Sequence, residues 1–428
     1  MVKKSSLNNI KITHLPGGIK VISEKITQIK SFSLGFWFNV GSRDENESNN
    51  GISHFLEHMF FKGTKKRSAK KIAEDIESLG GYLNAFTSKE HTCFYGRGLA
   101  QHIDQTFEVL ADMVQNSVFS PNEIEKESRV VIDELYDIED SPDELIFDKF
   151  ESNTFAGNSL GFPIIGTEKN LRSFSQKNLK KFVKDHYSFE NFFIVASGNV
   201  SHSNLLKLVD KFIVKENNSA FKYKRDLKLQ PSTDLFVEKE TQQVHYIIGR
   251  PTYGTKDKRR ICVNVLSQIL GEGSSSRLFQ KIREENGIAY QINTFLNSFY
   301  DISTFGVYLS TNENSVYKAQ SLIFEEIEKI KSKKVTEKEL NRAKEYLIGN
   351  MLMSLESTTN RMLRIAQSMI YFNKIKSVDE TIRKIQAVSA EEIREIANEI
   401  FDSNNKSVNG NLTRVILSPK NLLLQLVA

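Results

Sequence analysis

The sequence predicts an α+β protein made of two homologous domains, each a mostly antiparallel sheet with helices packed on it. At 428 residues the chain is long for one hydrophobic core, so two domains of about 200 residues are expected. Runs of strands are followed by runs of helices, and the second half repeats the order of the first. Hydrophobic residues make up 39% and charged residues 26%, as in an ordinary globular protein.

The first half alternates short strand patterns with helical ones. Apolar residues at every second position of 31–40 place one face of that strand in a core. The paired glycines at 80–81 stop the preceding helix. The expected elements are strands at 18–24 and 31–40, helices at 52–61 and 69–79, strands at 82–87 and 92–98, helices up to about residue 187, a strand at 192–197 and a helix from about residue 204.

The second half follows the same order, and the segment 285–290 lines up with 77–82. The polar stretch around 215–219 is the natural break between the halves. We therefore expect an N-terminal domain at 1–214, a linker at 215–230 and a C-terminal domain at 231–428. The expected elements are strands at 235–239 and 244–249, helices at 261–270 and 277–285, strands at 289–297 and 304–310, long helices from 315 to about 400 and a strand at 413–417.

The helix expected at 52–61 carries the most informative motif, His54-Phe55-Leu56-Glu57-His58. Side chains four apart share a helix face, so both imidazoles can reach one zinc ion at about 2.0–2.1 Å. Glu57 faces the same space without being needed as a ligand. A hydrolytic site needs a metal that lowers the pKa of a water molecule and a carboxylate that can accept the proton of that water. This order of residues is that of the inverzincins.

The alternative is a helix whose histidines are ordinary core or surface residues. Apolar side chains surround the polar trio, and burying such groups without a partner is costly. This favours a metal site. Asn49 or Asn50 is expected to cap the start of the helix.

A second helix is expected to supply the third ligand. The sequence Ser-Pro-Asn-Glu at 120–123 is typical of a helix start, and the pattern continues to about residue 137. Glu127 and Glu134 lie two turns apart on one face of it. We predict Glu134 as the ligand and Glu127 as a carboxylate that orients a ligand imidazole or the water. The alternative is that both are exposed helix glutamates.

With these motifs the chain resembles the pitrilysin-type zinc peptidases, in particular the short two-domain branch of the mitochondrial processing peptidase and its bacterial homologues. The resemblance covers nearly the whole chain. The residues that carry it are 54–59, 61–64, Gly80, Gly81, 84–88, Glu90, Thr92, Tyr95, 127–134, Asp140, Pro142, 275–278, 283–285 and Tyr290.

The resemblance implies a zinc endopeptidase with one Zn²⁺ per chain that cleaves unfolded peptides or presequence-like segments inside a chamber. It implies that an extended substrate pairs with the strand of Asn84, Ala85, Phe86 and Thr87. Without the resemblance, these residues predict only a short strand after two glycines. Phe86 is then either part of a pocket wall or a core residue.

The second half lacks the metal motif and carries Arg283 and Tyr290 instead. By resemblance this pair holds the substrate and its tetrahedral intermediate, and both side chains are donors suited to a carbonyl oxygen that gains charge. Without the resemblance, Arg283 reads as a surface helix residue and Tyr290 as a core aromatic. Whether the pair acts within one chain or across a dimer is open.

The resemblance also implies partners. A homodimer is expected because one chain carries both the metal motif and the Arg/Tyr pair, and a heterodimer with a homologous subunit is the second possibility. The rival function is a non-catalytic or partner-dependent scaffold or processing subunit of the same fold. The chain keeps the complete set of zinc ligands, which argues against this alternative.

Charge and cysteine content narrow the possible functions and cellular compartments of the protein. The net charge of +5 is spread along the chain, without the basic stripe and interleaved aromatics of a nucleic-acid binder. Cys93 and Cys262 make no framework of disulfides, which favours a reducing compartment. No signal-like or membrane-spanning apolar run is evident, so we expect a cytoplasmic protein without membrane contact.

Overall fold

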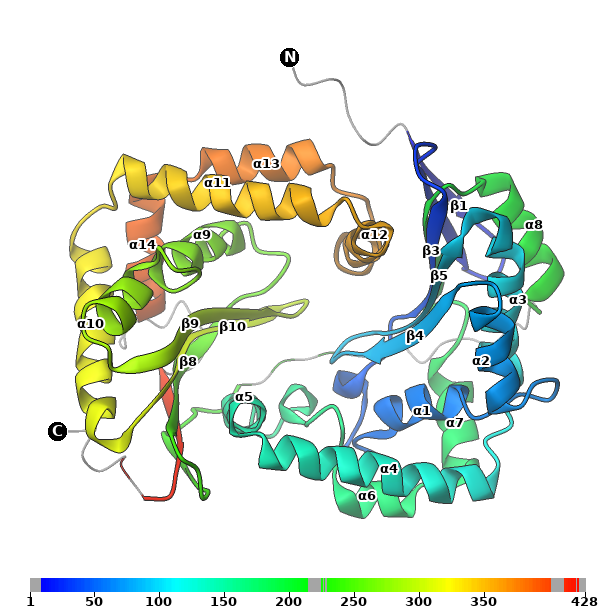
Figure 1. The fold of residues 1–428 in the computed structure, drawn as a ribbon, viewed down its shortest axis with the longest axis horizontal. Coiled ribbons are helices and arrows are strands. Elements are labelled where there is room, and N and C mark those ends of the chain that lie inside the picture. Colours follow the sequence, from blue (N-terminus) through cyan, green and yellow to red (C-terminus); the bar gives the residue numbers. More distant parts are fainter. Residues whose placement is uncertain are drawn as a thin grey trace. The chain divides into compact units, whose positions relative to one another are not determined.

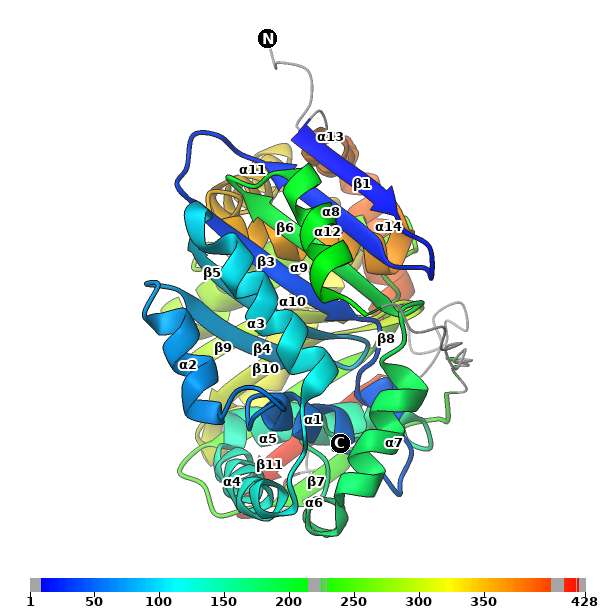
Figure 2. The same ribbon diagram turned by 90° about the vertical axis from the view of Figure 1, so that its right-hand side faces the viewer.

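A computed structural model describes residues 9–214, 225, 227, 229–401, 412–420 and 422. The described residues form two sheets with helices around them, which confirms the predicted α+β class (Figures 1 and 2). None of the helices in these ranges is long and apolar enough to cross a membrane.

Both sheets are mostly antiparallel. The first has six strands in the order β1-β2-β6-β3-β5-β4, and the second has five in the order β7-β11-β8-β10-β9. The strands are β1 (Ile10–His14), β2 (Lys20–Lys25), β3 (Ser31–Phe38), β4 (Tyr82–Thr87), β5 (Thr92–Leu99), β6 (Phe192–Gly198), β7 (Leu235–Glu238), β8 (Val244–Tyr253), β9 (Ala289–Ser298), β10 (Ile302–Thr311) and β11 (Thr413–Ser418).

The predicted repeat is visible in the strand pairing. In each sheet one pair is parallel, β2 with β6 and β7 with β11, and the other pairs are antiparallel. The run β2-β6-β3-β5-β4 therefore corresponds strand for strand to β7-β11-β8-β10-β9. Strand β1 was not predicted from the sequence; it is an addition at the edge of the first sheet and pairs with β2.

The helices follow the predicted order. Residues 277–285, expected as a helix, contain the π-helical turn η5 (Phe279–Glu284). The α-helices are α1 (Ile52–Phe60), α2 (Ala69–Glu77), α3 (Ile103–Asn116), α4 (Pro121–Asp140), α5 (Pro142–Thr154), α6 (Glu168–Ser173), α7 (Gln176–His186), α8 (His202–Phe212), α9 (Arg260–Leu270), α10 (Val316–Ser332), α11 (Glu337–Ser354), α12 (Thr358–Phe372), α13 (Val378–Ala387) and α14 (Ala390–Phe401).

The chain folds into two compact units, and each takes a segment from the other half of the sequence. Most of the expected linker 215–230 lies outside the described residues, and the boundaries 1–214 and 231–428 remain a prediction about the sequence repeat. Among the described residues, unit 1 contains those up to Tyr136, those from Phe162 to Arg225, and Met353–Val378, while unit 2 contains Asp137–Gly161, Leu227–Leu352 and those from Asp379 onward.

In unit 1 the first sheet is covered on both faces. Helices α3 and α8 pack on one face and α12 on the other, as Figure 1 shows. The α12 side chains Met362, Ile365 and Met369 bury the indole of Trp37 on β3, together with the apolar face of neighbouring strands. An element from the second half of the sequence thus completes the core of the unit that holds the metal motif.

Unit 2 has the reciprocal arrangement. Helix α5, from the first half of the sequence, packs on β8 and β11 through Leu145, Ile146 and Phe150. The opposite face of this sheet packs on α9, α10 and α14. Helix α12 contacts β3 and β6, the strands that correspond to β8 and β11. The two units have therefore exchanged equivalent helices.

Candidate metal centre

Helix α1 is buried on every side except one stripe. Its only residues that are not buried are His54, Glu57 and His58, and the others pack into the core of unit 1. The spacing of three and four residues brings the three side chains to the same face. The local sequence thus directs its polar groups toward a single opening, as the motif predicts.

The start of α1 is fixed by a residue that sequence reasoning missed. The first helical residue follows Gly51, which makes no side-chain cap, so the prediction that Asn49 or Asn50 caps the helix is wrong. The buried carboxylate of Glu45 accepts instead from the amides of Gly51 and Ser53 at 2.8 Å and from Asn50 Nδ2 at 3.0 Å. Burial raises the pKa of Glu45 to about 7, although these donors oppose the shift.

Replacing Glu45 with alanine is expected to destabilise the fold. Buried N–H donors that lose their acceptor cost about 1–3 kcal/mol, so the free energy of unfolding should fall by about that amount. The fall should be larger at pH 6 than at pH 8, because the raised pKa makes the ionised, buried carboxylate of Glu45 costly above pH 7. Denaturant unfolding measures this. The exposed Glu47 in the same loop is the matched control, and equal stability losses for Glu45→Ala and Glu47→Ala would contradict the capping role.

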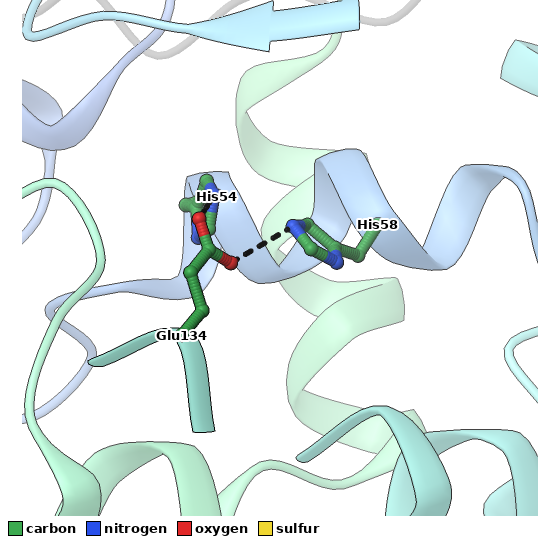
Figure 3. A group of neighbouring side chains, drawn as sticks. All are labelled: His54, His58 and Glu134. Carbon is green, nitrogen blue, oxygen red and sulfur yellow. Dashed lines mark ion pairs between the residues drawn. The ribbon is translucent and has the colours of Figure 1, made fainter. Parts of the chain in front are cut away.

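The third member of the site comes from α4. The helix begins at Pro121 with the Ser120 hydroxyl accepting from Glu123 N, as predicted. Glu134 projects from α4 to the two imidazoles (Figure 3): its Oε1 lies 3.7 Å from His54 Nε2 and its Oε2 lies 3.5 Å from His58 Nε2. Potential ligand atoms of the three residues all lie within 4.8 Å of one another.

These separations fit a shared ion better than direct hydrogen bonds. At 3.5–3.7 Å the nitrogens and carboxylate oxygens are too far apart for good hydrogen bonds. Two atoms that each lie 2.0–2.1 Å from a tetrahedral zinc are about 3.3 Å apart. Within the described ranges this is the only group of three or more such side chains that could hold a metal. Two imidazoles and one carboxylate are a donor set of catalytic zinc sites.

The two imidazoles have different electrostatic surroundings. Burial, together with the neighbouring His58, lowers the pKa of His54 to about 3, which keeps its ring neutral and able to bind a metal. The ring of His54 also has a buried Nδ1 without a hydrogen-bond partner among the described residues. Burial opposes protonation of His58 too, but the hydrogen bond with Glu127 and the charges of nearby carboxylates leave its pKa raised.

Glu127 lies where a residue that orients a ligand should lie. Its side chain is 5% exposed, and its Oε1 is 2.9 Å from His58 Nδ1. A carboxylate only accepts, so Nδ1 carries a proton, and in the neutral ring Nε2 is the nitrogen left to bind a metal. The other oxygen of Glu127 is 2.6 Å from Lys62 Nζ. The sequence analysis named Lys62 only within the motif 61–64 and assigned it no role, although its position four residues after His58 was a usable signal.

Glu57 lies beside the same opening but outside the three-residue metal group. Burial raises the pKa of its carboxyl, while the hydroxyl of Thr87 opposes this shift. Thr87 ends β4, so the last residue of the expected substrate strand adjoins the expected general base.

Strand β4 is an edge strand, hydrogen-bonded only to β5 among the described strands. Asn84 is exposed, and its Oδ1 accepts from the amide of Ala85 at 2.9 Å. Phe86 is half-buried, with its ring 5.5 Å from that of Trp37, so it belongs in part to the core.

Arg283 and Tyr290 lie together in unit 2. The Tyr290 side chain is 75% exposed, which excludes the alternative that it is a core aromatic. The guanidinium carbon of Arg283 lies 4.8 Å from the centre of the Tyr290 ring, and both residues line a cavity of about 350 Å³. Further residues around the cavity are Gln243, Gly287, Ile288, Ala289, Thr311 and Asn312.

The chain is similar to proteins of a known peptidase family. Residues 20–168 match the model for insulinase (peptidase family M16), and residues 173–347 match that for the peptidase M16 inactive domain. The uncharacterized zinc protease YmxG of Bacillus subtilis is 36% identical over 90% of this chain and 94% of its own. An uncharacterized zinc protease of Streptomyces coelicolor is 32% identical over 92% of this chain and 88% of its own.

Solved structures share the fold. A protease from Helicobacter pylori superposes with a TM-score of 0.89 at 23% identity, over 96% of this chain and 99% of that one. A peptidase M16 inactive domain from Pseudomonas fluorescens gives 0.87 at 18% identity, over 96% and 98%. The resemblance to pitrilysin-type peptidases is confirmed: the chain belongs to peptidase family M16.

Proposed function

We propose that this protein is a zinc-dependent endopeptidase that hydrolyses unfolded peptides or presequence-like segments. The observation that carries the proposal is the convergence of His54, His58 and Glu134, with Glu57 beside them on the one open stripe of α1. Relatives named zinc proteases support the metal and the reaction class. One Zn²⁺ is proposed per chain, held by these three ligands.

The chemistry divides among residues of unit 1. Bound zinc supplies a Lewis acid that makes water a nucleophile near neutral pH. Glu57 accepts a proton from the water that attacks the peptide carbonyl and delivers it to the leaving amine as the C–N bond breaks. Glu127 keeps His58 in the tautomer and orientation that ligation requires.

The free edge of β4 is the proposed peptide site. The amide of Ala85 on this strand bonds to the adjacent Asn84 side chain. An extended peptide would take that amide as a strand partner, with Phe86 and Thr87 leading its backbone toward Glu57. Strand addition reads backbone rather than side chains, which suits a peptidase with broad specificity.

Arg283 and Tyr290 are proposed to bind the substrate carbonyl as its oxygen gains charge. Their support is the exposed phenol and the adjoining guanidinium at the 350 Å³ cavity. A homodimer is proposed, with a heterodimer as the alternative. The free, buried Cys93 and Cys262 favour a reducing compartment such as the cytoplasm.

The direct test is cleavage of an unstructured peptide mixture by the purified protein, read by mass spectrometry. We expect new peptide termini with wild-type protein, none after zinc is removed with a chelator, and recovery when zinc is restored. Zinc-loaded protein that cleaves nothing, alone or with a homologous subunit, would contradict the proposal and favour a scaffold role. Such a role is suggested only by the inactive-domain match of residues 173–347.

A further inference from the structure

We infer that Lys62 is a positioning residue of the metal centre, acting on the ion through Glu127 and His58. This inference rests on the proposed function, because it assigns a role toward the same ion. Lys62 lies four residues after His58 and two residues beyond the end of α1. Its partner is the carboxylate that already holds His58.

The last turn of α1 determines where Lys62 lies. The helix ends at Phe60, and the amide of Lys62 still bonds to the carbonyl of Met59 at 3.2 Å. The next residue, Gly63, has φ of 117°, a conformation open to glycine, and turns the chain away. Lys62 is therefore the last side chain before this turn.

The contact is short and largely shielded from water. Lys62 Nζ is 2.6 Å from Glu127 Oε2, with the lysine side chain 30% exposed and that of Glu127 5% exposed. At this burial the pair is screened far less than a surface ion pair. Lys62 also approaches no other carboxylate within 4.0 Å among the described residues.

The two contacts of Glu127 depend on each other. One carboxylate oxygen holds His58 Nδ1 and the other holds Lys62 Nζ, so each oxygen of a buried group has a strong donor. Without the ammonium, one oxygen would stay buried without a donor, which costs free energy that the carboxylate can recover by turning toward water. That rotation would release Nδ1 and leave the ring of His58 free to turn. Lys62 thereby fixes the ligand geometry from outside the ligand set.

The test is the zinc affinity of metal-free protein, measured by competition with a chromophoric chelator. Loss of a partner beyond the ligands costs about 10–100-fold in metal affinity, so Lys62→Met should raise the Kd for zinc by about tenfold or more. Lys62→Arg, which keeps a charged donor, should restore most of the affinity. In a Glu127→Gln background, Lys62→Met should add little, because the lysine acts through that carboxylate.

The exposed Lys66, in the loop that follows, is the matched control, and Lys66→Met should leave the Kd unchanged. An unchanged Kd for Lys62→Met, or an equal loss in the Glu127→Gln background, would overturn the role of Lys62 while leaving the peptidase proposal intact. A wild-type protein that binds no zinc would overturn both. Nitrogen-15 spectra of the histidines add a second readout, since His58 should lose its fixed Nδ1–H tautomer in Lys62→Met.

Discussion

Glu57→Gln is expected to bind zinc as wild-type protein does and to lose nearly all peptide hydrolysis. Glutamine has the same shape but cannot accept the proton of the attacking water. General-base catalysis contributes about 10²–10⁴-fold, so kcat should fall by that factor. Zinc should stay because the metal group is made by His54, His58 and Glu134, without Glu57. Quantitative mass spectrometry measures the expected loss of turnover, and elemental analysis measures the zinc that the variant is expected to retain.

The matched control is Glu125→Gln on α4, an exposed glutamate paired with Arg129 at the surface. It should cleave at the wild-type rate. A normal kcat for Glu57→Gln would contradict the role of Glu57 as the general base. One that lost both zinc and turnover would place Glu57 among the ligands instead.

His58→Ala is expected to lose the metal itself. The substitution removes one of three ligands and leaves two that cannot enclose the ion. The loss of zinc affinity should exceed the roughly 10–100-fold typical of partners beyond the ligands. Elemental analysis after dialysis should find little zinc and no peptidase activity, and added zinc should restore activity only weakly.

His14→Ala is the control for this substitution, because His14 is an exposed residue of β1 in the same unit. It should retain zinc. Thermal unfolding of both metal-free variants separates loss of the ligand from loss of the fold. A folded His58→Ala protein with a full zinc complement would contradict the ligand assignment.

The sequence allowed most strands and helices to be predicted because their signals are local. Alternating apolar residues mark β3, and the two glycines after α2 mark its end. The exchange of α5 and α12 could not be predicted in this way. An amphipathic helix shows that it has an apolar face but not which sheet covers that face, and the answer depends on contacts far apart in sequence.

In the metal centre, too, residues with a local sequence signal could be predicted and a residue without one could not. His54, Glu57 and His58 share one short helix, so periodicity alone brings them together. Glu134 was predictable from the helix start at Ser120 and from the face it shares with Glu127. Glu45 was not, because it caps α1 from an irregular loop whose path no periodic pattern describes.

The exchange of α5 and α12 also suggests how this two-unit chain evolved. An element swapped between two equivalent units is what a domain-swapped dimer displays when two identical chains trade one segment. Here α5 contacts β8 and β11 while α12 contacts the corresponding β3 and β6, so the trade is symmetric. Joining the two copies of such a dimer into one gene would give this chain directly. One copy could then lose its ligands while the helix it lends continued to support the copy that kept them.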